Sequence, residues 1–203
     1  MGCNERTREV VLRVLEAYQG PIILDGDAIN VLSLEKDGKL LAKRPGPILL
    51  TPHLGELARF CGITTGEVEE NPLKKMKDVV DQTHCSVLMK AKCNYLALTN
   101  GKIYVHDFPN DGMATGGIGD VLSGVIAGLL AQQWSRATKK ELKKPIDMMH
   151  YSACLGLLTH SYAGQFAAEK IGKRTMTASS VITHLTDAFF EMERCDKVEL
   201  LNL

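Results

Sequence analysis

Short apolar runs alternate along the first half of the chain with segments whose apolar positions recur at helical spacing. The runs at residues 22–24, 47–50 and 86–89 have almost no polar positions, which is typical of strands buried on both faces of a parallel sheet. Asn100-Gly101 separates two further apolar runs, 95–98 and 103–105, and this dipeptide favours a tight antiparallel hairpin. We therefore predict an α/β fold with a mainly parallel central sheet, helices on both faces and a hairpin appended at one edge.

Apolar residues at helical spacing mark the helices of this fold. The spacing predicts helices over 10–15, 54–61, 73–80 and 121–130, with two more around 148–168 and 179–190. In the helix over 121–130 we expect Gly124 and Gly128 to let a neighbour approach closely. The charged stretch 136–144 is expected to be a surface connector. Because 203 residues with 45% apolar side chains can bury one sizeable core, we expect residues 1–203 to form a single domain.

Charge and cysteine content narrow the classes of function. Lys plus Arg and Asp plus Glu number 24 each, so no net positive field attracts nucleic acid or an anionic membrane surface. The six cysteines are scattered without zinc-ligand spacing, which indicates free thiols in a reducing cytoplasm and no protein-bound metal. No stretch is long and apolar enough to span a bilayer. We expect a cytoplasmic protein that acts on small molecules.

The most informative segment is a glycine-rich loop that runs directly into the apolar helix and is followed by Asp120. Backbone N–H groups and the helix dipole meet at such a junction and bind anions. The segment lacks the Gly-Lys-Ser/Thr of a P-loop, and Leu122 stands where a dinucleotide fingerprint needs glycine. Asp120 is placed to accept a proton from a hydroxyl that attacks a phosphoryl group. The alternative is a flexible surface loop. The predicted anion hole consists of Gly116, Gly117, Ile118 and Gly119.

Several motifs of the chain together resemble those of one enzyme family. Gly-x-Gly-Asp before a buried helix is similar to the anion-hole signature of the ribokinase-like enzymes, which include vitamin-related kinases and the NAD(P)HX dehydratases. Leu-Asp-Gly-Asp-Ala-Ile-Asn at 24–30 resembles the dehydratases' Leu-Asp-Ala-Asp-Ala-Leu-Asn, and Leu-Thr-Pro-His-Leu-Gly-Glu at 50–56 resembles their Leu-Thr-Pro-His-Pro-Gly-Glu. The segments 112–117 and 158–164 are similar as well. His53 discriminates best, because pyrimidine kinases usually carry asparagine there.

The resemblance implies a role for each matching residue. Asp120 would be the catalytic base and touch the substrate, Gly119 would contact the nucleotide, and His53 would contact the hydrated nicotinamide. The segment 90–94 aligns with the dehydratases' Lys-Gly-Ala-x-Thr, which holds the adenosine monophosphate portion of the nucleotide; the lysine is kept and the glycine is lost. The residues of this segment are Lys90, Ala91, Lys92, Cys93 and Asn94.

Some polar residues allow two interpretations. Asp25 and Asp27 follow the first predicted strand, where ligands gather in open α/β sheets, yet aspartate is also a common helix cap. Asn30 is a third possible site residue in the same motif. Apart from the resemblance, His53 would be a capping or surface histidine. We expect structural roles for the other histidines, His84, His106, His150, His160 and His184.

The function implied by the resemblance is dehydration of the S-epimer of hydrated NADH or NADPH, driven by ADP or ATP with Mg²⁺. Two alternatives stay open: a vitamin-precursor kinase that uses the same Asp120, and an inactive nucleotide-binding or assembly module. The dehydratases carry glycine-rich strands ahead of the segment matched by 22–24, so we expect an N-terminally incomplete domain. An open sheet edge would favour a homo-oligomer, such as the tetramers common in the family.

Overall fold

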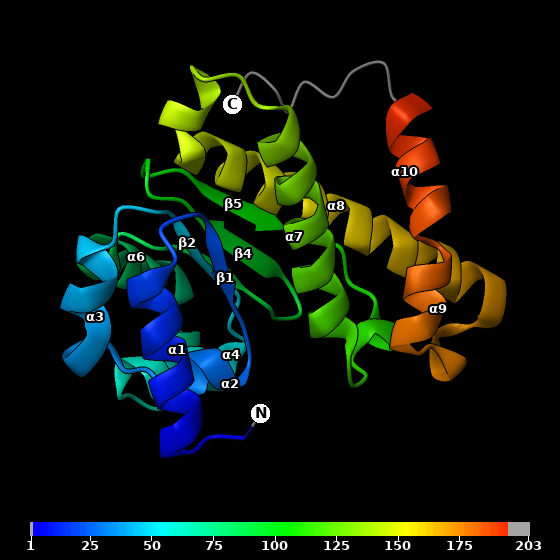
Figure 1. Ribbon diagram of the computed structural model, residues 1–203. Helices are drawn as coiled ribbons and strands as arrows, with labels where there is room; N and C mark the ends of the chain where they lie inside the picture. Colours follow the sequence, from blue (N-terminus) through cyan, green and yellow to red (C-terminus); the bar gives the residue numbers. More distant parts are fainter. Residues whose placement is uncertain (1, 195–203) are drawn as a thin grey trace. The chain divides into compact units, whose positions relative to one another are not determined.

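The computed structural model describes residues 2–194, which form two compact units (Figure 1). The first unit contains the chain up to Asp107 together with Gln132–Tyr151, and the second contains Phe108–Ala131 and the chain from Ser152 onward. The sheet lies in the first unit and the glycine-rich loop in the second. None of the helices in the described part is long and apolar enough to cross a membrane.

A five-stranded sheet with its strands in chain order forms the centre of the first unit. The first three strands are parallel, as predicted, and the last three form an antiparallel meander. Gly101 adopts φ +85° in the final turn, a conformation that glycine accepts without strain, and this confirms the hairpin. The strands are β1 (Ile22–Leu24), β2 (Ile48–Leu50), β3 (Ser86–Met89), β4 (Asn94–Ala97) and β5 (Ile103–His106).

Both faces of the parallel strands are buried, which explains why their sequences are almost wholly apolar. Leu50 and Val87 point to one face and pack in the main apolar core of the unit. Side chains alternate along a strand, so Ser86 and Leu88 point to the opposite face. There the Ser86 hydroxyl lies 3.1 Å from Nε2 of buried His150, which belongs to the first turns of the helix that starts at Pro145. Helical residues therefore contact both faces, as predicted.

Six helices surround the core on the first face, and their apolar side chains complete it. The predicted helices over 10–15, 54–61 and 73–80 are all present. Asn71 caps the last of these and Pro72 occupies its first position, where proline costs no hydrogen bond. The helices are α1 (Glu5–Ala17), α2 (Asp27–Asn30), α3 (Leu34–Lys43), α4 (Leu54–Cys61), α5 (Thr65–Glu70) and α6 (Pro72–Thr83).

Helices and short 3₁₀ turns make up the second unit. Residues of α7, α8, α9 and α10 contribute to its apolar cluster, which includes Ile118, Ala163 and Val181. The predicted connector 136–144 is exposed apart from half-buried Ala137, and it contains a 3₁₀ turn, η2 (Glu141–Lys143), within the first unit. The remaining elements are η1 (Asp111–Met113), α7 (Ile118–Arg136), α8 (Pro145–Ile171), η3 (Lys173–Thr175), α9 (Ala178–Thr183) and α10 (Leu185–Arg194).

Close packing between α7 and α8 does not use the glycines that the sequence suggested. A Cβ built on Gly124 or Gly128 would meet no atom of the described chain within 4 Å, so the prediction for these two positions was wrong. A Cβ built on Gly156 of α8 would instead collide with Ile126 of α7. The small residue lies on the other helix of the pair, because the bulky Ile126 faces inward on α7.

Candidate functional site

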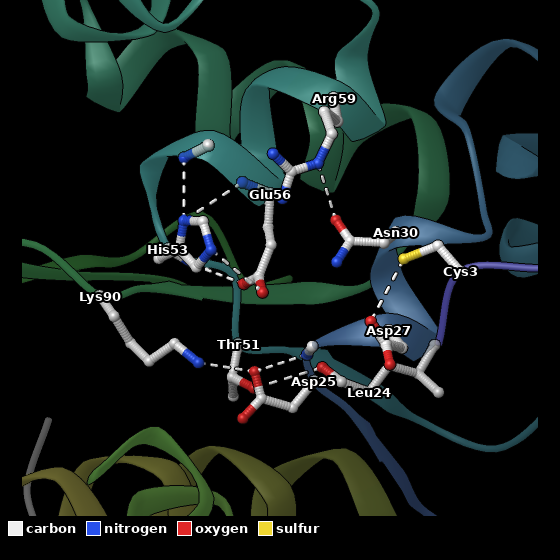
Figure 2. A network of polar contacts seen from close by, with 12 residues as sticks. Cys3, Leu24, Asp25, Asp27, Asn30, Thr51, His53, Glu56, Arg59 and Lys90 are labelled. Carbon is white, nitrogen blue, oxygen red and sulfur yellow. Dashed lines mark hydrogen bonds and ion pairs between the residues drawn. The ribbon is translucent and has the colours of Figure 1, made fainter. Parts of the chain in front are cut away.

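The carboxyl ends of β1, β2 and β3 bring together residues from three sequence motifs. Asp25 follows β1, Thr51 follows β2 and Lys90 follows β3. Parallel pairing continues beyond the strands, since the Lys90 N–H donates to the Pro52 carbonyl at 2.8 Å and the backbone of His53 forms a parallel bridge with Lys90. This is the edge of an open α/β sheet at which ligands bind. Figure 2 shows the labelled side chains gathered there.

Asp25 and Lys90 form an ion pair at this edge (Figure 2). The Lys90 ammonium donates to Oδ1 of Asp25 at 2.6 Å, and the Gly26 N–H donates to the same oxygen at 2.9 Å. The two side chains are only 20% and 17% exposed, so water screens the attraction weakly. The structure thus brings together two candidate residues from separate motifs, and their ion pair holds the Lys90 ammonium beside the strand ends.

Asp27 and Asn30 make different contacts, both within the first unit. Oδ1 of Asp27 accepts a hydrogen bond from the Cys3 thiol at 3.2 Å, which lowers the pKa of the Asp27 carboxyl and raises the pKa of the thiol. The Asn30 side-chain oxygen accepts from Nε of Arg59 at 2.9 Å. Gly26 is the N-cap of α2 and no side chain caps that helix, so neither Asp25 nor Asp27 is its cap.

His53 caps α4 and keeps its ring exposed (Figure 2). Its Nδ1 accepts hydrogen bonds from the N–H groups of Gly55 at 3.0 Å and Glu56 at 3.4 Å. A ring nitrogen that accepts cannot carry the proton, so the proton of a neutral ring lies on Nε2. That nitrogen is 3.2 Å from Oε1 of buried Glu56, whose other oxygen accepts from the His53 N–H at 2.8 Å. The capping interpretation of His53 is confirmed, and the 52% exposed side chain still faces solvent.

Residues 90–94 form the turn between β3 and β4. Lys90 ends the parallel strand, Ala91 and Lys92 are exposed, and Asn94 begins β4. The Asn94 side chain accepts a hydrogen bond from the Ala91 N–H at 3.3 Å, and this bond links the two ends of the turn. Cys93 is half-buried, and this burial raises the pKa of its thiol.

In the second unit the glycine-rich loop leads into the N-terminus of α7. Gly116 and Gly117 are exposed, and Gly117 has φ +84° with a hypothetical Cβ 3.1 Å from the Ala178 side chain, so only glycine fits there. Buried Ile118 anchors the helix start, Gly119 is partly exposed, and the Asp120 side chain is exposed in the first turn. The first N–H groups of an α-helix have no partner within the helix. The geometry therefore offers donors and a carboxylate at one helix end.

Contacts within the second unit hold this loop in place. The Asn110 side chain donates to the Gly164 carbonyl at 2.9 Å and accepts from the Gly112 N–H at 3.1 Å. A Cβ on Gly164 would collide with Met113, and a Cβ on Gly112 would collide with Met176. The sequence reasoning missed Asn110 as an anchor, although asparagine two residues before glycine is a known turn signal. These contacts anchor residues 110–113, whereas residues 114–117 of the loop are exposed.

Within residues 2–194 no three His, Cys, Asp or Glu side chains come together in a way that would hold a metal ion. The candidate residues form two groups, one in each unit. The first unit carries Asp25, His53 and the segment 90–94, and the second carries the loop with Asp120.

Comparison with known proteins identifies the family. The sequence model of the NAD(P)H-hydrate dehydratases matches residues 1–187. The chain belongs to this family. The bifunctional NAD(P)H-hydrate repair enzyme of Moorella thermoacetica is 35% identical over 179 residues, which cover 88% of this chain and 31% of that enzyme. The ADP-dependent (S)-NAD(P)H-hydrate dehydratase of Neisseria meningitidis is 37% identical over 137 residues, which cover 65% of this chain and 46% of the relative. The chain thus matches less than half the length of these NAD(P)H-hydrate dehydratase relatives.

Solved structures confirm the ribokinase-like fold. The ADP/ATP-dependent NAD(P)H-hydrate dehydratase of Bacillus subtilis, co-crystallized with ATP/Mg²⁺, superimposes with a TM-score of 0.77 at 23% identity, covering 94% of this chain and 61% of the other. A ribokinase-like superfamily protein of Enterococcus faecalis superimposes with a TM-score of 0.62 at 22% identity, covering 93% of this chain and 61% of the other. The α/β class and the ribokinase-like architecture expected from the sequence are therefore correct.

Proposed function

We propose that this chain carries out the dehydration of the S-epimer of hydrated NADH or NADPH, with ADP or ATP as the phosphate donor. The observation that carries the proposal is the parallel bridge between His53 and Lys90 at the strand ends. This bridge places His53, which would contact the hydrated nicotinamide, next to Lys90, which would contact the nucleotide. Membership in the NAD(P)H-hydrate dehydratase family supports the same reaction.

Roles follow for the residues of each unit. Lys90, with the turn 90–94, would hold the adenosine monophosphate portion of the nucleotide, and His53 would contact the substrate through its exposed ring. Gly119 would contact the nucleotide, and the amides of 116–119 would hold the transferring phosphoryl group. Asp27 and Asn30 lie beside the first group, and Asp25, within it, would act through its ion pair with Lys90.

The chemistry has two stages. The C6 hydroxyl of the hydrated ring attacks the terminal phosphorus of ADP or ATP, the bridging P–O bond breaks, and AMP or ADP leaves. Asp120 takes the hydroxyl proton, as a positioned general base does. The ring nitrogen's lone pair then expels phosphate from C6, and loss of a proton from C5 to solvent restores the double bond of NADH or NADPH.

Magnesium is consistent with this arrangement although residues 2–194 form no cluster of ligating side chains. Mg²⁺ usually keeps several waters and binds through substrate phosphates and one or two carboxylates. The Bacillus subtilis relative is described with ATP/Mg²⁺. In this chain the ion would be held by the nucleotide phosphates and by Asp120, the carboxylate nearest in sequence to the proposed anion hole. The bound ion would offset the charge of the phosphates.

The direct test mixes the protein with hydrated NADH and either ADP or ATP, and follows the near-ultraviolet absorbance of NADH. We expect the absorbance to return only when a nucleotide is present, and the faster donor identifies the preference. Nucleotide binding without turnover would indicate an inactive binding module. Release of a phosphorylated alcohol from a vitamin precursor, with no NADH formed, would indicate a kinase.

Assembly is a separate part of the proposal. We propose that residues 1–203 act as one dehydratase domain that self-associates. In the described part of the chain β1 pairs on one side only, with β2, and an edge strand can pair with another chain. Light scattering at several protein concentrations distinguishes an oligomer from a monomer, and a concentration-independent monomer would contradict this part.

A further inference from the structure

A buried histidine outside both candidate groups holds the first peptide of α7. His160 lies in α8, is 6% exposed, and has Nε2 3.1 Å from the carbonyl oxygen of Ile118. A carbonyl oxygen only accepts hydrogen bonds, so the His160 Nε2 must carry a proton and donate it. Both residues belong to the second unit. The bond therefore fixes a carbonyl at the start of the helix that carries Asp120.

The Ile118 carbonyl shares its peptide group with the N–H of Gly119. A trans peptide is planar, and its C=O and N–H point in opposite directions. As the first residue of α7, Ile118 already directs its C=O along the helix toward the N–H of Leu122, and His160 is a second donor to the same oxygen. By holding this C=O, His160 also holds the direction of the Gly119 N–H. That N–H lies in the first turn of α7, where the helix supplies no acceptor, so it points out of the helix N-terminus.

The same bond strengthens the Gly119 N–H as a donor. Hydrogen bonds in a chain polarise one another, by roughly 10–30% per bond, because donation to a carbonyl draws electron density from the amide nitrogen. Asn110 and Gly117 set the position of the loop, but neither contacts the Ile118 carbonyl in the bonds described above. His160 is therefore suited to control one amide rather than the loop as a whole.

We infer that His160 is a positioning residue that orients and polarises the Gly119 N–H toward a phosphate of the bound nucleotide. This inference rests on the proposed anion hole. His160 lies behind the peptide and does not touch the nucleotide itself. A purely structural histidine would contribute to stability alone, whereas this one contributes specifically to the binding of phosphate.

Three variants separate these roles. His160→Gln can place an amide N–H near the position of Nε2 and keep the bond, His160→Leu keeps the size and loses the donor, and His160→Asn is polar but too short to reach. Calorimetry compares ADP with adenosine, which has no phosphate. We expect His160→Leu and His160→Asn to weaken ADP binding about tenfold, the usual effect of losing a hydrogen bond to a charged group, and to leave adenosine binding unchanged. His160→Gln should recover ADP binding to within about threefold of the wild type.

An equal loss of ADP and adenosine binding would overturn the inference, because it would indicate general damage to the unit. Unchanged ADP binding in folded His160→Leu and His160→Asn would overturn it as well. If the wild type itself binds no ADP, the proposed function fails, and the amide proton resonance of Gly119 in the free protein decides the inference alone. We expect that resonance to move in His160→Asn and to be restored in His160→Gln; a resonance that does not move in His160→Asn would refute the role of His160.

Discussion

Nζ of Lys90 lies 2.6 Å from Oδ1 of Asp25 although 65 residues separate them in sequence. The pair forms because β1 and β3 both run parallel to β2, which lies between them, so their carboxyl ends meet at one edge of the sheet. An ammonium that is largely shielded from water and already paired can exchange its carboxylate for a phosphate. In the proposed site, Asp25 would then compete with the nucleotide for Lys90.

This competition gives the two residues opposite effects on nucleotide binding. We expect Lys90→Met to weaken ADP binding by about 10- to 100-fold, the effect of losing a charge-assisted hydrogen bond. Asp25→Asn should leave ADP binding unchanged or tighten it, because the lysine keeps its charge and loses its competitor. Calorimetry with ADP measures both variants, with Lys102→Met at the exposed hairpin turn as the matched control. Equal weakening by both variants would instead make Asp25 the residue that positions Lys90.

Much of this fold could be predicted because burial determines its strands directly. Runs such as 48–50 are apolar at every position since both faces of the sheet are covered, and the helices over 54–61 and 73–80 show a clear apolar stripe. The helices α2, α3 and α5 were not predicted. Two of them, α2 and α5, have only four and six residues. The ten-residue α3 is held by the contact between Asp37 and Arg8 of α1, which no local pattern reveals.

The motifs of the candidate site are visible in the sequence, whereas the contacts between their residues are not. The motifs around His53 and Asp120 are continuous in sequence, so their resemblance to the dehydratases could be read directly. The spacing of His53 and Glu56 is also that of a capping box. The contact between His160 and Ile118 joins residues 42 apart through the packing of α8 on the loop, and only the tertiary structure brings such residues together.

The two roles of His53 can be separated by choosing the replacement. Asparagine is a good N-cap, so His53→Asn should change the free energy of unfolding by less than about 0.5 kcal/mol, whereas His53→Ala should cost about 1 kcal/mol. If the exposed ring also contacts the hydrated nicotinamide, both variants should lose at least about tenfold in turnover. Urea unfolding and the NADH absorbance assay measure the two effects. Full turnover in His53→Asn would restrict His53 to capping.

Asp37 makes the stability of the first unit sensitive to acid. Burial alone would raise the pKa of this carboxyl, but hydrogen bonds from Arg8 and from the Ser33 N–H, with the charge of Arg8, hold the pKa below its ordinary value. A lowered folded-state pKa gives stability that is present above the unfolded pKa, near 4, and is lost as the pH falls through the folded value. At neutral pH we expect Asp37→Asn to lower the free energy of unfolding by about 2 to 3 kcal/mol.

The control for Asp37 is a solvent-exposed ion pair with the same distance between nitrogen and oxygen. Glu9 and Arg13 also approach to 2.6 Å, but their side chains are 59% and 76% exposed, whereas the Asp37 side chain is 4% exposed. Glu9→Gln should therefore change the free energy of unfolding by less than about 1 kcal/mol. Unfolding curves between pH 7 and pH 2 should show that Asp37→Asn loses less stability on acidification than the wild type. Parallel pH profiles for the two proteins would contradict the assignment.

Asp120 is proposed as the general base, and its replacement tests the chemistry apart from the binding. Asp120→Asn keeps the shape and removes the proton acceptor, so turnover should fall by about 10²- to 10⁴-fold. Nucleotide affinity should change much less, because the backbone amides at the start of α7 stay in place, and loss of a negative charge beside a phosphate can tighten binding. Single-turnover rates and ADP affinities are measured in one buffer, with Asp81→Asn on the exposed face of α6 as the matched control.

Gly119→Ala supplies the opposite comparison to Asp120→Asn within the same turn of helix. Its added methyl group would lie beside the N–H proposed to meet the phosphate, so ADP binding should suffer at least as much as the rate of the bound complex. Loss of the general base should thus lower mainly the turnover rate, whereas damage to the phosphate-binding N–H should lower ADP affinity at least as much. If Asp120→Asn turns over at nearly the wild-type rate, the proton must leave the hydroxyl by another route, and the proposed mechanism is wrong even though the family assignment stands.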